Sequence, residues 1–307
     1  VIDFNPTDRI FNVLPMFHSF GLTAGTLLPL FSGIYTFHYP SPLHYQIVPE
    51  MVYTTNATIL FGTNSFLAGY AKYADPYDFY SLRYVFAGAE KLYDSIRQQW
   101  LDKFGIRILE GYGATETSPV LTMNTPMFNK KGTVGKLLPG IEYKIKKIKG
   151  IAEGGELHVR GPNVFLGYYK ADQPKKMQFC EDHSYNTGDI ISMDEDGFVT
   201  IQGRSKRFAK VAGEMVSLTQ IESYLVQKWP AYKHAVVTTP DESKGEKLIL
   251  FTEHKMQKRE LRTYLKSVGL TEIQCPKQIE VIHTIPLLGS GKVDYIALES
   301  QAKQSHT

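Results

Sequence analysis

The chain has 307 residues, of which 43% are hydrophobic and 21% are charged, and its formal net charge is +3. This length and composition predict about two domains with a sizeable core, and the weak positive charge demands neither nucleic acid nor an acidic partner. Cys180 and Cys275 lie far apart without CxxC or CxxH spacing, which argues against a disulfide framework or a zinc site and fits a reducing compartment.

The most hydrophobic segment, residues 17–31, is shorter than the roughly 20 apolar residues that cross a bilayer. Polar and helix-breaking residues interrupt it: His18, Ser19, Gly21, Gly25 and Pro29. We expect a buried helix, with a membrane-dipping segment as the alternative, and no transmembrane segment. Because the chain begins without Met or a signal segment, we expect it to be a piece of a longer protein.

The first third of the chain alternates β-rich runs with a helical pattern. Strands are expected at residues 9–14, 34–37 and 58–61, and a helix is expected at residues 20–31. These alternating elements are typical of an α/β domain.

The clearest unit follows at residues 84–109. A strand at residues 84–87 breaks at Gly88, and the next strand, residues 106–109, breaks at Gly111. Between them, four hydrophobic residues recur at every fourth position, which places them on one stripe of a helix: Leu92, Ile96, Trp100 and Phe104. Strand–helix–strand of this length predicts a right-handed crossover and parallel pairing.

Two glycine-rich turns are therefore expected at one edge of the sheet. The turn Gly88-Ala89-Glu90 and the turn from Gly111 to Glu116 both follow the carboxyl ends of parallel strands. Open parallel sheets bind their ligands at that edge. The sequence therefore predicts a ligand-binding site there.

Residues 132–203 have the texture of a small antiparallel or barrel-like subdomain. Strands are expected at residues 134–135, 143–145, 156–159 and 198–201, with hairpin turns at residues 153–155 and 194–197.

The last hundred residues predict a compact α+β module. Ser217 is expected to cap a helix with Gln220 as its capping-box partner. A strand at residues 248–251, a helix through Leu261 and Leu265, and a strand at residues 279–282 follow.

We place the domain boundary at Gly203–Lys206. This gives a large domain of residues 1–203, truncated at its start, with an α/β part (1–131) and a β-rich part (132–203). A small mobile α+β domain covers residues 204–307. The fold class is thus α/β, a partial parallel-sheet N-terminal domain with a small β subdomain, plus an α+β C-terminal domain.

The turn after the second parallel strand contains the side chains best suited to a nucleotide. Tyr112, between Gly111 and Gly113, can stack on a purine or pack beneath a tight turn. Thr115 and Glu116 suit phosphate contact and Mg²⁺ ligation. For Glu116, a helix first-turn position favoured by the macrodipole is the alternative.

Three further residues carry both a functional and a plain interpretation. Asp189 can accept hydrogen bonds from ribose hydroxyls or close an Asx-turn. Arg204 can reach the ribose or a phosphate, or be a solvated linker charge. Lys292, after Gly289 and Gly291, can neutralise charge in a transition state or be an exposed terminal lysine.

His18 and a group of lysines each also allow two interpretations. His18, beside Phe17, is either a satisfied core histidine or a residue that lines or gates a pocket. Seven lysines form either a solvated face or a landing patch for an acidic carrier protein or anionic lipid: positions 130, 131, 136, 144, 146, 147 and 149.

Taken in order, these motifs resemble the adenylate-forming superfamily of acyl-CoA synthetases, peptide-synthetase adenylation domains and luciferase. The matching motifs cover nearly the whole chain: LPMFHSFG (14–21), GYGATE (111–116), YNTGD (185–189), GRSK (203–206) and PLLGSGK (286–292). Residues 39–45, 75–80, 203–217 and 285–292 are most similar to one group. That group is the acyl-[acyl-carrier-protein] synthetase half of bacterial bifunctional 2-acylglycerophosphoethanolamine acyltransferases, and the chain resembles the C-terminal part of such a protein.

The resemblance implies a two-step reaction with ATP and Mg²⁺ as cofactors. A fatty carboxylate attacks the α-phosphate of ATP, and the acyl-adenylate then passes its acyl group to the thiol of acyl carrier protein. The full-length enzyme would reacylate lysophosphatidylethanolamine at the cytoplasmic face of the bacterial inner membrane. A fatty acyl-CoA ligase, with coenzyme A as the thiol, and a non-catalytic fragment that binds a nucleotide or a partner protein are the alternatives.

The resemblance also implies a role for each candidate residue. Tyr112, with its flanking glycines, and Gly88, Ala89 and Glu90 would hold adenine. Thr115 would contact phosphate, Glu116 would bind Mg²⁺, and Asp189 with Arg204 would hold the ribose. Lys292 would stabilise the adenylation transition state and Lys206 would be the hinge. Phe17 and His18 would line the substrate pocket.

The chain also departs from the family. The Ser/Thr/Gly-rich phosphate loop, the acyltransferase half and the opening strands of the sheet are expected to be missing. We therefore expect the 307-residue chain alone to show little or no carboxylate-dependent pyrophosphate exchange.

Overall fold

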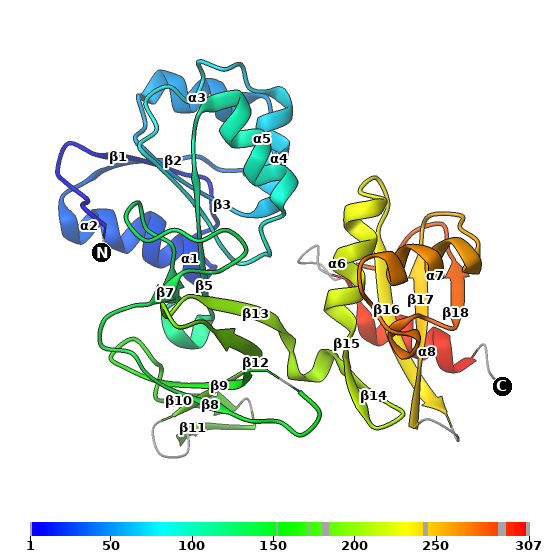
Figure 1. Cartoon of the computed structure of the whole chain (residues 1–307). Coiled ribbons are helices and arrows are strands. Elements are labelled where there is room, and N and C mark those ends of the chain that lie inside the picture. The colour runs from blue at the N-terminus through cyan, green and yellow to red at the C-terminus, as the bar shows by residue number, and fades with distance from the viewer. Residues whose placement is uncertain are drawn as a thin grey trace. The chain divides into compact units, whose positions relative to one another are not determined.

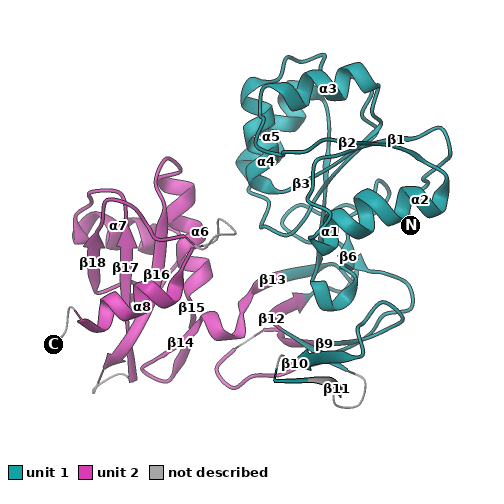
Figure 2. Ribbon diagram, turned by 180° about the vertical axis from the view of Figure 1, so that it is seen from behind, with its two compact units in different colours: residues 1–144, 158–187, 193–200 teal, residues 145–157, 188–192, 201–307 magenta. Residues whose placement is uncertain are grey.

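Residues 2–151, 153–170, 172–179, 184–241, 245–287 and 293–304 are described in the computed structural model (Figure 1). For residues 170, 174–176, 178 and 179, only the backbone is described. The chain divides into two compact units (Figure 2). Unit 1 comprises residues 1–144, 158–187 and 193–200, and unit 2 comprises residues 145–157, 188–192 and 201–307.

Unit 1 is built on a seven-stranded sheet of order β2-β1-β3-β4-β5-β6-β7. The first five strands are parallel, whereas β6 and β7 are antiparallel to their neighbours. The strands are β1 (Arg9–Asn12), β2 (Tyr35–His38), β3 (Ile59–Gly62), β4 (Tyr84–Ala87), β5 (Ile108–Gly113), β6 (Val120–Met123) and β7 (Lys136–Leu137).

Helices cover both faces of this sheet (Figure 1). Leu60 and Val85 point to one face, where Trp100 is fully buried, and Ile59 and Phe86 point to the other. One face carries α3 (Ile47–Thr55), α4 (Asn64–Tyr73) and α5 (Asp94–Phe104). The other carries α1 (Ser19–Leu22), the π-helical turn η1 (Thr23–Leu27) and α2 (Leu28–Ser32). Burial on both faces explains why β3 and β4 are continuous hydrophobic runs.

The predicted strand–helix–strand unit is confirmed as β4, α5 and β5, with β4 and β5 parallel. The predicted break of the second strand at Gly111 is wrong. The strand continues to Gly113 because β6 pairs with it. A Cβ at Gly113 would lie 1.6 Å from the Pro119 carbonyl oxygen, so this glycine permits a close strand approach instead of ending the strand.

The helix predicted at residues 20–31 is present as α1, η1 and α2. The expectation that it is buried is wrong for part of its surface. Gly21, Gly25 and Pro29 are buried, but Leu30 and Phe31 are exposed. The segment packs one side on the sheet and turns the other outward.

Two smaller sheets follow in the chain. A four-stranded sheet has the order β13-β12-β9-β8, and β10 pairs with β11. These strands are β8 (Glu142–Lys146), β9 (Gly155–Arg160), β10 (Gly167–Lys170), β11 (Gln173–Phe179), β12 (Tyr185–Met193) and β13 (Val199–Arg204). The expected hairpin turns contain Gly154 and Gly197 at φ of +85° and +82°. The strand predicted at residues 134–135 is wrong, because Gly135 has φ of +84° and the strand begins at Lys136.

Most of unit 2 is a five-stranded sheet with helices on both faces. Its path is β15-β14-β17-β16, and β18 is parallel to β17. The strands are β14 (Phe208–Val211), β15 (Glu214–Ser217), β16 (His234–Asp241), β17 (Gly245–Thr252) and β18 (Gln278–Val281). One face packs on α6 (Leu218–Lys228) and α7 (Lys258–Ser267), and the other on α8 (Tyr295–Gln304). Short 3₁₀ helices are η2 (Thr115–Thr117), η4 (Ser205–Arg207) and η5 (Glu272–Gln274).

Ser217 caps α6 as predicted, because its Oγ accepts the Gln220 N–H at 3.2 Å. The α/β class with a mixed sheet is also confirmed. The boundary predicted at Gly203–Lys206 falls where β13 ends and η4 begins. The division into residues 1–203 and 204–307 stays a prediction.

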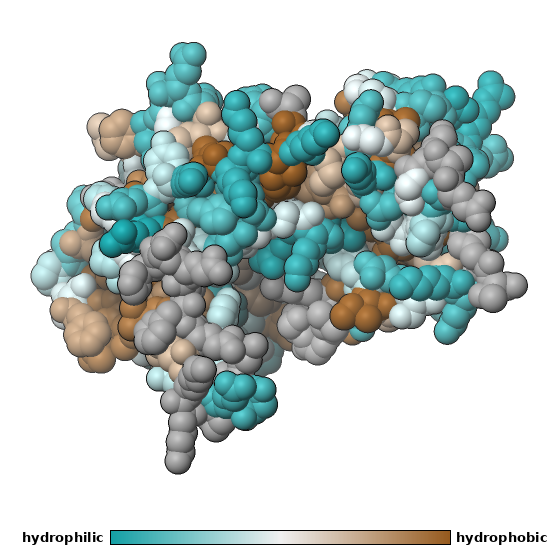
Figure 3. Space-filling model, turned by 90° about the horizontal axis from the view of Figure 1, so that it is seen from below, coloured by the Kyte–Doolittle hydropathy of each residue, from teal (hydrophilic) through white to brown (hydrophobic). Residues whose placement is uncertain are grey.

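Large hydrophobic side chains reach the surface at scattered positions. On the face shown in Figure 3, hydrophobic residues interrupt the hydrophilic surface in several separate places. Phe17, Met127 and Phe31 are among the most exposed. Within the described ranges, no helix combines the length and hydrophobicity needed to cross a membrane.

Candidate functional site

The loops that follow β1, β3, β4 and β5 meet at the carboxyl edge of the parallel strands of unit 1. The hydroxyl oxygens of Ser19, after β1, and Thr115, after β5, are 3.3 Å apart. The loops after β3 and β4 are joined because Glu90 accepts hydrogen bonds from Ser65. This edge is where open parallel sheets bind ligands.

The turn after β4 is shaped by its packing. A Cβ at Gly88 would lie 3.2 Å from the Phe20 ring, so this buried glycine lets the ring lie close to the backbone. Ala89 has φ of +64°, in the left-handed region. The Glu90 carboxylate accepts the Ser65 N–H at 3.0 Å and the Ser65 hydroxyl at 2.8 Å. Glu90 therefore satisfies donors at the N-terminus of α4.

Tyr112 lies inside β5, opposite Thr122 of β6. The sequence predicted it in a turn, but pairing with β6 keeps the backbone extended through Gly113. Its side chain is half-buried at the edge where the strand ends.

The loop after β5 holds Thr115 and Glu116 in η2. The buried Thr117 hydroxyl accepts the Ala114 N–H at 2.9 Å and donates to the Pro119 carbonyl at 2.6 Å. These bonds fix the turn from inside and leave Thr115 exposed and Glu116 half-buried. Glu116 thus stands in the first turn of a three-residue 3₁₀ helix.

A segment 43 to 52 residues further along the chain forms hydrogen bonds with the same turn. The Asn163 side chain donates to the Thr117 carbonyl at 2.7 Å and to the Val120 carbonyl at 2.8 Å. The Tyr168 hydroxyl donates to Oε1 of Glu116 at 2.8 Å. The sequence reasoning missed both residues, because no local pattern relates positions so far apart.

The buried Glu110 braces β5 just before Tyr112. Its carboxylate receives hydrogen bonds from Arg97 at 2.7 Å and from the Leu92 N–H at 3.1 Å. Burial raises the pKa of the Glu110 carboxyl, against the opposing effect of these donors. This ion pair fixes the start of α5 against β5.

Phe17 and His18 lie in the loop after β1. Phe17 is 95% exposed, and His18 is also exposed. The His18 Nδ1 accepts the Phe20 N–H at 3.2 Å and so caps α1. The interpretation of His18 as a satisfied core histidine is therefore wrong, because it sits at a helix start on the surface.

Asp189 and Arg204 lie in unit 2 and contact one another. Asp189 is buried in the strand β12, whereas the alternative interpretation placed it in an Asx-turn, and it follows Gly188 at φ of +67°. Its Oδ1 is 3.3 Å from Nε of Arg204, the last residue of β13. The Arg204 side chain is largely exposed.

Lys206, the residue predicted as the hinge, is exposed in η4. Its neighbour Arg207 is anchored. Arg207 donates to Glu222 at 2.6 Å, and its guanidinium lies 3.8 Å from the centre of the Tyr295 ring. Lys292 and the motif glycines Gly289 and Gly291 lie outside the described residues.

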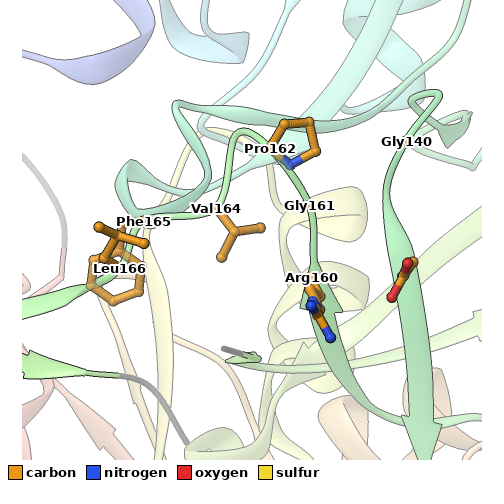
Figure 4. Close-up of a pocket in the computed structure, with 8 residues that line it drawn as sticks. Gly140, Arg160, Gly161, Pro162, Val164, Phe165 and Leu166 are labelled. Atoms are coloured by element: carbon orange, nitrogen blue, oxygen red, sulfur yellow. The ribbon is translucent and has the colours of Figure 1, made fainter. Parts of the chain in front are cut away.

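A cavity of about 370 Å³ lies beneath the loop Gly161–Leu166 in unit 1 (Figure 4). Arg160 and Glu142, on the adjacent strands β9 and β8, line it together with Val164. Phe165 also lines the cavity, and its N–H donates to the Glu116 carbonyl at 2.8 Å. The same loop thus borders the cavity and the turn that carries Glu116.

The residues present fit Mg²⁺ bound together with a nucleotide. Magnesium is commonly held by one or two carboxylates plus substrate phosphates and water. The described residues contain no group of three or more His, Cys, Asp or Glu side chains that could hold a metal alone. Glu116, on a half-exposed turn beside the Thr115 hydroxyl, can supply one carboxylate.

Residues 1–169 match the AMP-binding enzyme family. The chain belongs to this family. It is 29% identical over 299 residues to a long-chain-fatty-acid–CoA ligase of Yersinia pestis, covering 93% of this chain and 52% of the relative. It is 33% identical over 234 residues to the probable 4-coumarate–CoA ligase 3 of Dictyostelium discoideum, covering 73% of this chain and 42% of the relative.

The fold also matches a solved structure. ATP-bound MatB from Rhodopseudomonas palustris superposes with a TM-score of 0.83 at 26% identity, covering 99% of this chain and 62% of that protein. The chain spans about half the length of the curated relatives named above.

Proposed function

We propose that this chain forms part of an AMP-forming acid–thiol ligase that activates a fatty acid with Mg·ATP. The observation that carries this proposal is the meeting of the loops after β1, β3, β4 and β5, joined by the Ser19–Thr115 and Ser65–Glu90 contacts. Membership of the AMP-binding enzyme family supports the nucleotide. The fatty acid is supported by the relative named as a long-chain-fatty-acid–CoA ligase.

In unit 1, Tyr112 and the Gly88–Glu90 turn would hold the adenine. Glu90 would contribute its backbone, because its carboxylate is already bonded to Ser65. Thr115 would contact a phosphate and Glu116 would ligate Mg²⁺. The bound ion would neutralise charge on the phosphate oxygens.

In unit 2, the Asp189 carboxylate would accept hydrogen bonds from the ribose hydroxyls, oriented by Arg204 at 3.3 Å. Lys206 would be the hinge about which residues 204–307 rotate, and Lys292 would stabilise the adenylation transition state. Phe17 and His18 would border the entrance for the acid. Their exposure is consistent with a position at the rim of a site.

The proposed reaction has two steps, and each forms one bond between heavy atoms and breaks one. A carboxylate oxygen attacks the α-phosphorus of ATP, the bond to the β-phosphate oxygen breaks, and pyrophosphate leaves. The thiol sulfur then attacks the acyl carbon, the carbon–oxygen bond to AMP breaks, and the thiol proton is released. The products are a thioester and AMP.

The thiol acceptor divides the proposal into two variants. The motif resemblance favours acyl carrier protein, in an enzyme that also reacylates a lysophospholipid at the inner membrane. The relatives named as CoA ligases favour coenzyme A. Competition between the two thiols for the acyl group from one labelled fatty acid decides between them.

The test uses the full-length natural polypeptide that contains this sequence. We expect exchange of labelled pyrophosphate into ATP that depends on added long-chain fatty acid. Exchange that ignores the acid, or no exchange with any carboxylate, would refute the activity. Binding of ATP without exchange would instead support a non-catalytic nucleotide-binding role.

A further inference from the structure

The Glu116 carboxylate has a dedicated hydrogen-bond donor from another part of the chain. The hydroxyl of Tyr168 in β10 donates to Oε1 of Glu116 at 2.8 Å. The Tyr168 and Phe165 rings pack edge-on with their centroids 4.6 Å apart, and the Phe165 and Tyr185 rings pack edge-on with their centroids 5.4 Å apart. These aromatic contacts restrict the ring that carries the hydroxyl.

The backbone of the Glu116 turn is held by the same segment. The Phe165 N–H donates to the Glu116 carbonyl at 2.8 Å. The two Asn163 bonds hold the carbonyls of Thr117 and Val120. Figure 4 shows Phe165 on the loop that borders the cavity. The segment from Asn163 to Tyr168 therefore holds both the backbone from Glu116 to Val120 and the Glu116 side chain.

We infer that Tyr168 is a positioning residue that orients the Glu116 carboxylate for Mg²⁺ and thereby for the phosphates of ATP. This inference rests on the proposed function. A hydrogen bond to Oε1 fixes the carboxylate plane and leaves Oε2 available to an ion. Groups that orient a metal-ligating side chain commonly change metal affinity about 10- to 100-fold when they are removed.

The chain provides a matched control in the next residue. Tyr169 also lies in β10, is more exposed than Tyr168, and points to the other face of the strand. Tyr168→Phe and Tyr169→Phe therefore remove the same atom from neighbouring positions. Only the first removes a bond to Glu116.

The experiment measures ATP binding by calorimetry, with and without Mg²⁺, in the full-length natural polypeptide. We expect Tyr168→Phe to leave Mg²⁺-free ATP affinity unchanged and to reduce the gain in affinity from Mg²⁺ about tenfold. Tyr169→Phe should behave like the unmodified protein. Thermal unfolding of each variant shows whether the loss is local to the site.

A double-substitution cycle identifies the route of the effect. If Tyr168 acts through Glu116, Tyr168→Phe adds no further loss in a Glu116→Gln background. Full additivity of the two losses, or equal losses in Tyr168→Phe and Tyr169→Phe, would overturn the inference. No Mg²⁺-dependent change in Glu116→Gln itself would instead contradict the proposed role of Glu116, so the two failures are distinguishable.

Discussion

Gly113 shows how one residue constrains the loop that carries Thr115 and Glu116. A Cβ there would lie 1.6 Å from the Pro119 carbonyl oxygen, so β5 and β6 would have to separate. We predict that Gly113→Ala lowers the free energy of unfolding by about 1–3 kcal/mol and abolishes detectable Mg·ATP binding. Urea unfolding and calorimetry measure the two effects.

Gly132 is the control for this substitution. It has φ of +79°, and a Cβ there would meet nothing within 4 Å. Gly132→Ala therefore costs only backbone strain, about 1–2 kcal/mol, and should leave Mg·ATP affinity unchanged. Normal ATP binding by Gly113→Ala would show that the β5–β6 approach does not shape the site.

Substitution of Lys292 is expected to affect only one of the two half-reactions. If it stabilises only the adenylation transition state, Lys292→Ala suppresses adenylate formation and spares acyl transfer from preformed acyl-adenylate. Single-turnover assays of each half-reaction in the full-length polypeptide measure this difference. Equal loss in both would contradict the assigned role.

Single residues differ in how far sequence reveals them. Tyr112, Thr115 and Glu116 stand out because glycines, a hydroxyl and a carboxylate gather within six residues of a strand end. Tyr168 gives no such signal. Its relevance depends on a hydrogen bond across 52 residues, which requires the fold to be known.

At the scale of elements, one anchor of unit 2 is a largely buried ion pair. Arg207, at the end of η4, donates to Glu222 of α6 at 2.6 Å, and the Tyr295 hydroxyl of α8 also bonds to Glu222. We predict that Arg207→Ala destabilises unit 2 by about 3–5 kcal/mol, because it leaves a buried carboxylate without its cation. Hydrogen exchange of the β16 and β17 amides measures this loss.

The exposed pair of Arg262 with Glu272 provides the comparison. Both side chains are more than half exposed, so Arg262→Ala should change the stability of unit 2 far less than Arg207→Ala. Similar protection of β16 and β17 in the two variants would contradict the anchoring role of Arg207.

Glu222 also predicts a pH dependence of stability. Burial raises the pKa of the Glu222 carboxyl above the ordinary value of 4.5. The charge of Arg207 and the hydrogen bond from the Val236 N–H lower this pKa, but burial has the larger effect. The folded state therefore holds this proton more tightly than the unfolded state. The contribution of this proton to the free energy of unfolding is fully present below pH 4.5, and it is lost as the pH rises through the pKa of Glu222 in the folded state.

Glu222→Gln removes this titration. Its stability relative to the unmodified chain should therefore improve steadily as the pH rises from about 4 towards neutrality. Urea unfolding at several pH values measures the trend. Glu260→Gln, an exposed position on α7, is the control and should show a constant difference. A constant difference for Glu222→Gln would contradict the prediction.

Elements were predictable where periodicity was strong. The Leu92, Ile96, Trp100 and Phe104 stripe gave α5, although Leu92 precedes the helix. The strand end at Gly111 was not predictable, because the extension to Gly113 depends on pairing with β6. Helices α3 and α4 were missed because their buried side chains, such as Val52 and Leu67, sit among polar and aromatic residues without a clear stripe.

For the whole molecule, the order of five motifs predicted the fold class better than any single element. The Ser/Thr/Gly-rich phosphate loop of the adenylate-forming superfamily does not occur in these 307 residues. We therefore predict that the 307-residue chain alone shows little or no fatty-acid-dependent pyrophosphate exchange. Robust exchange by this chain would refute the prediction.

The fate of one oxygen atom tests the adenylation chemistry. A long-chain fatty acid labelled with ¹⁸O in its carboxylate is turned over by the full-length polypeptide with ATP, Mg²⁺ and a thiol, and the products are analysed by mass spectrometry. Attack on the α-phosphorus followed by thiol attack on the acyl carbon leaves one labelled oxygen in AMP. Label in inorganic phosphate, or AMP without label, would show that the carboxylate does not become an acyl-adenylate.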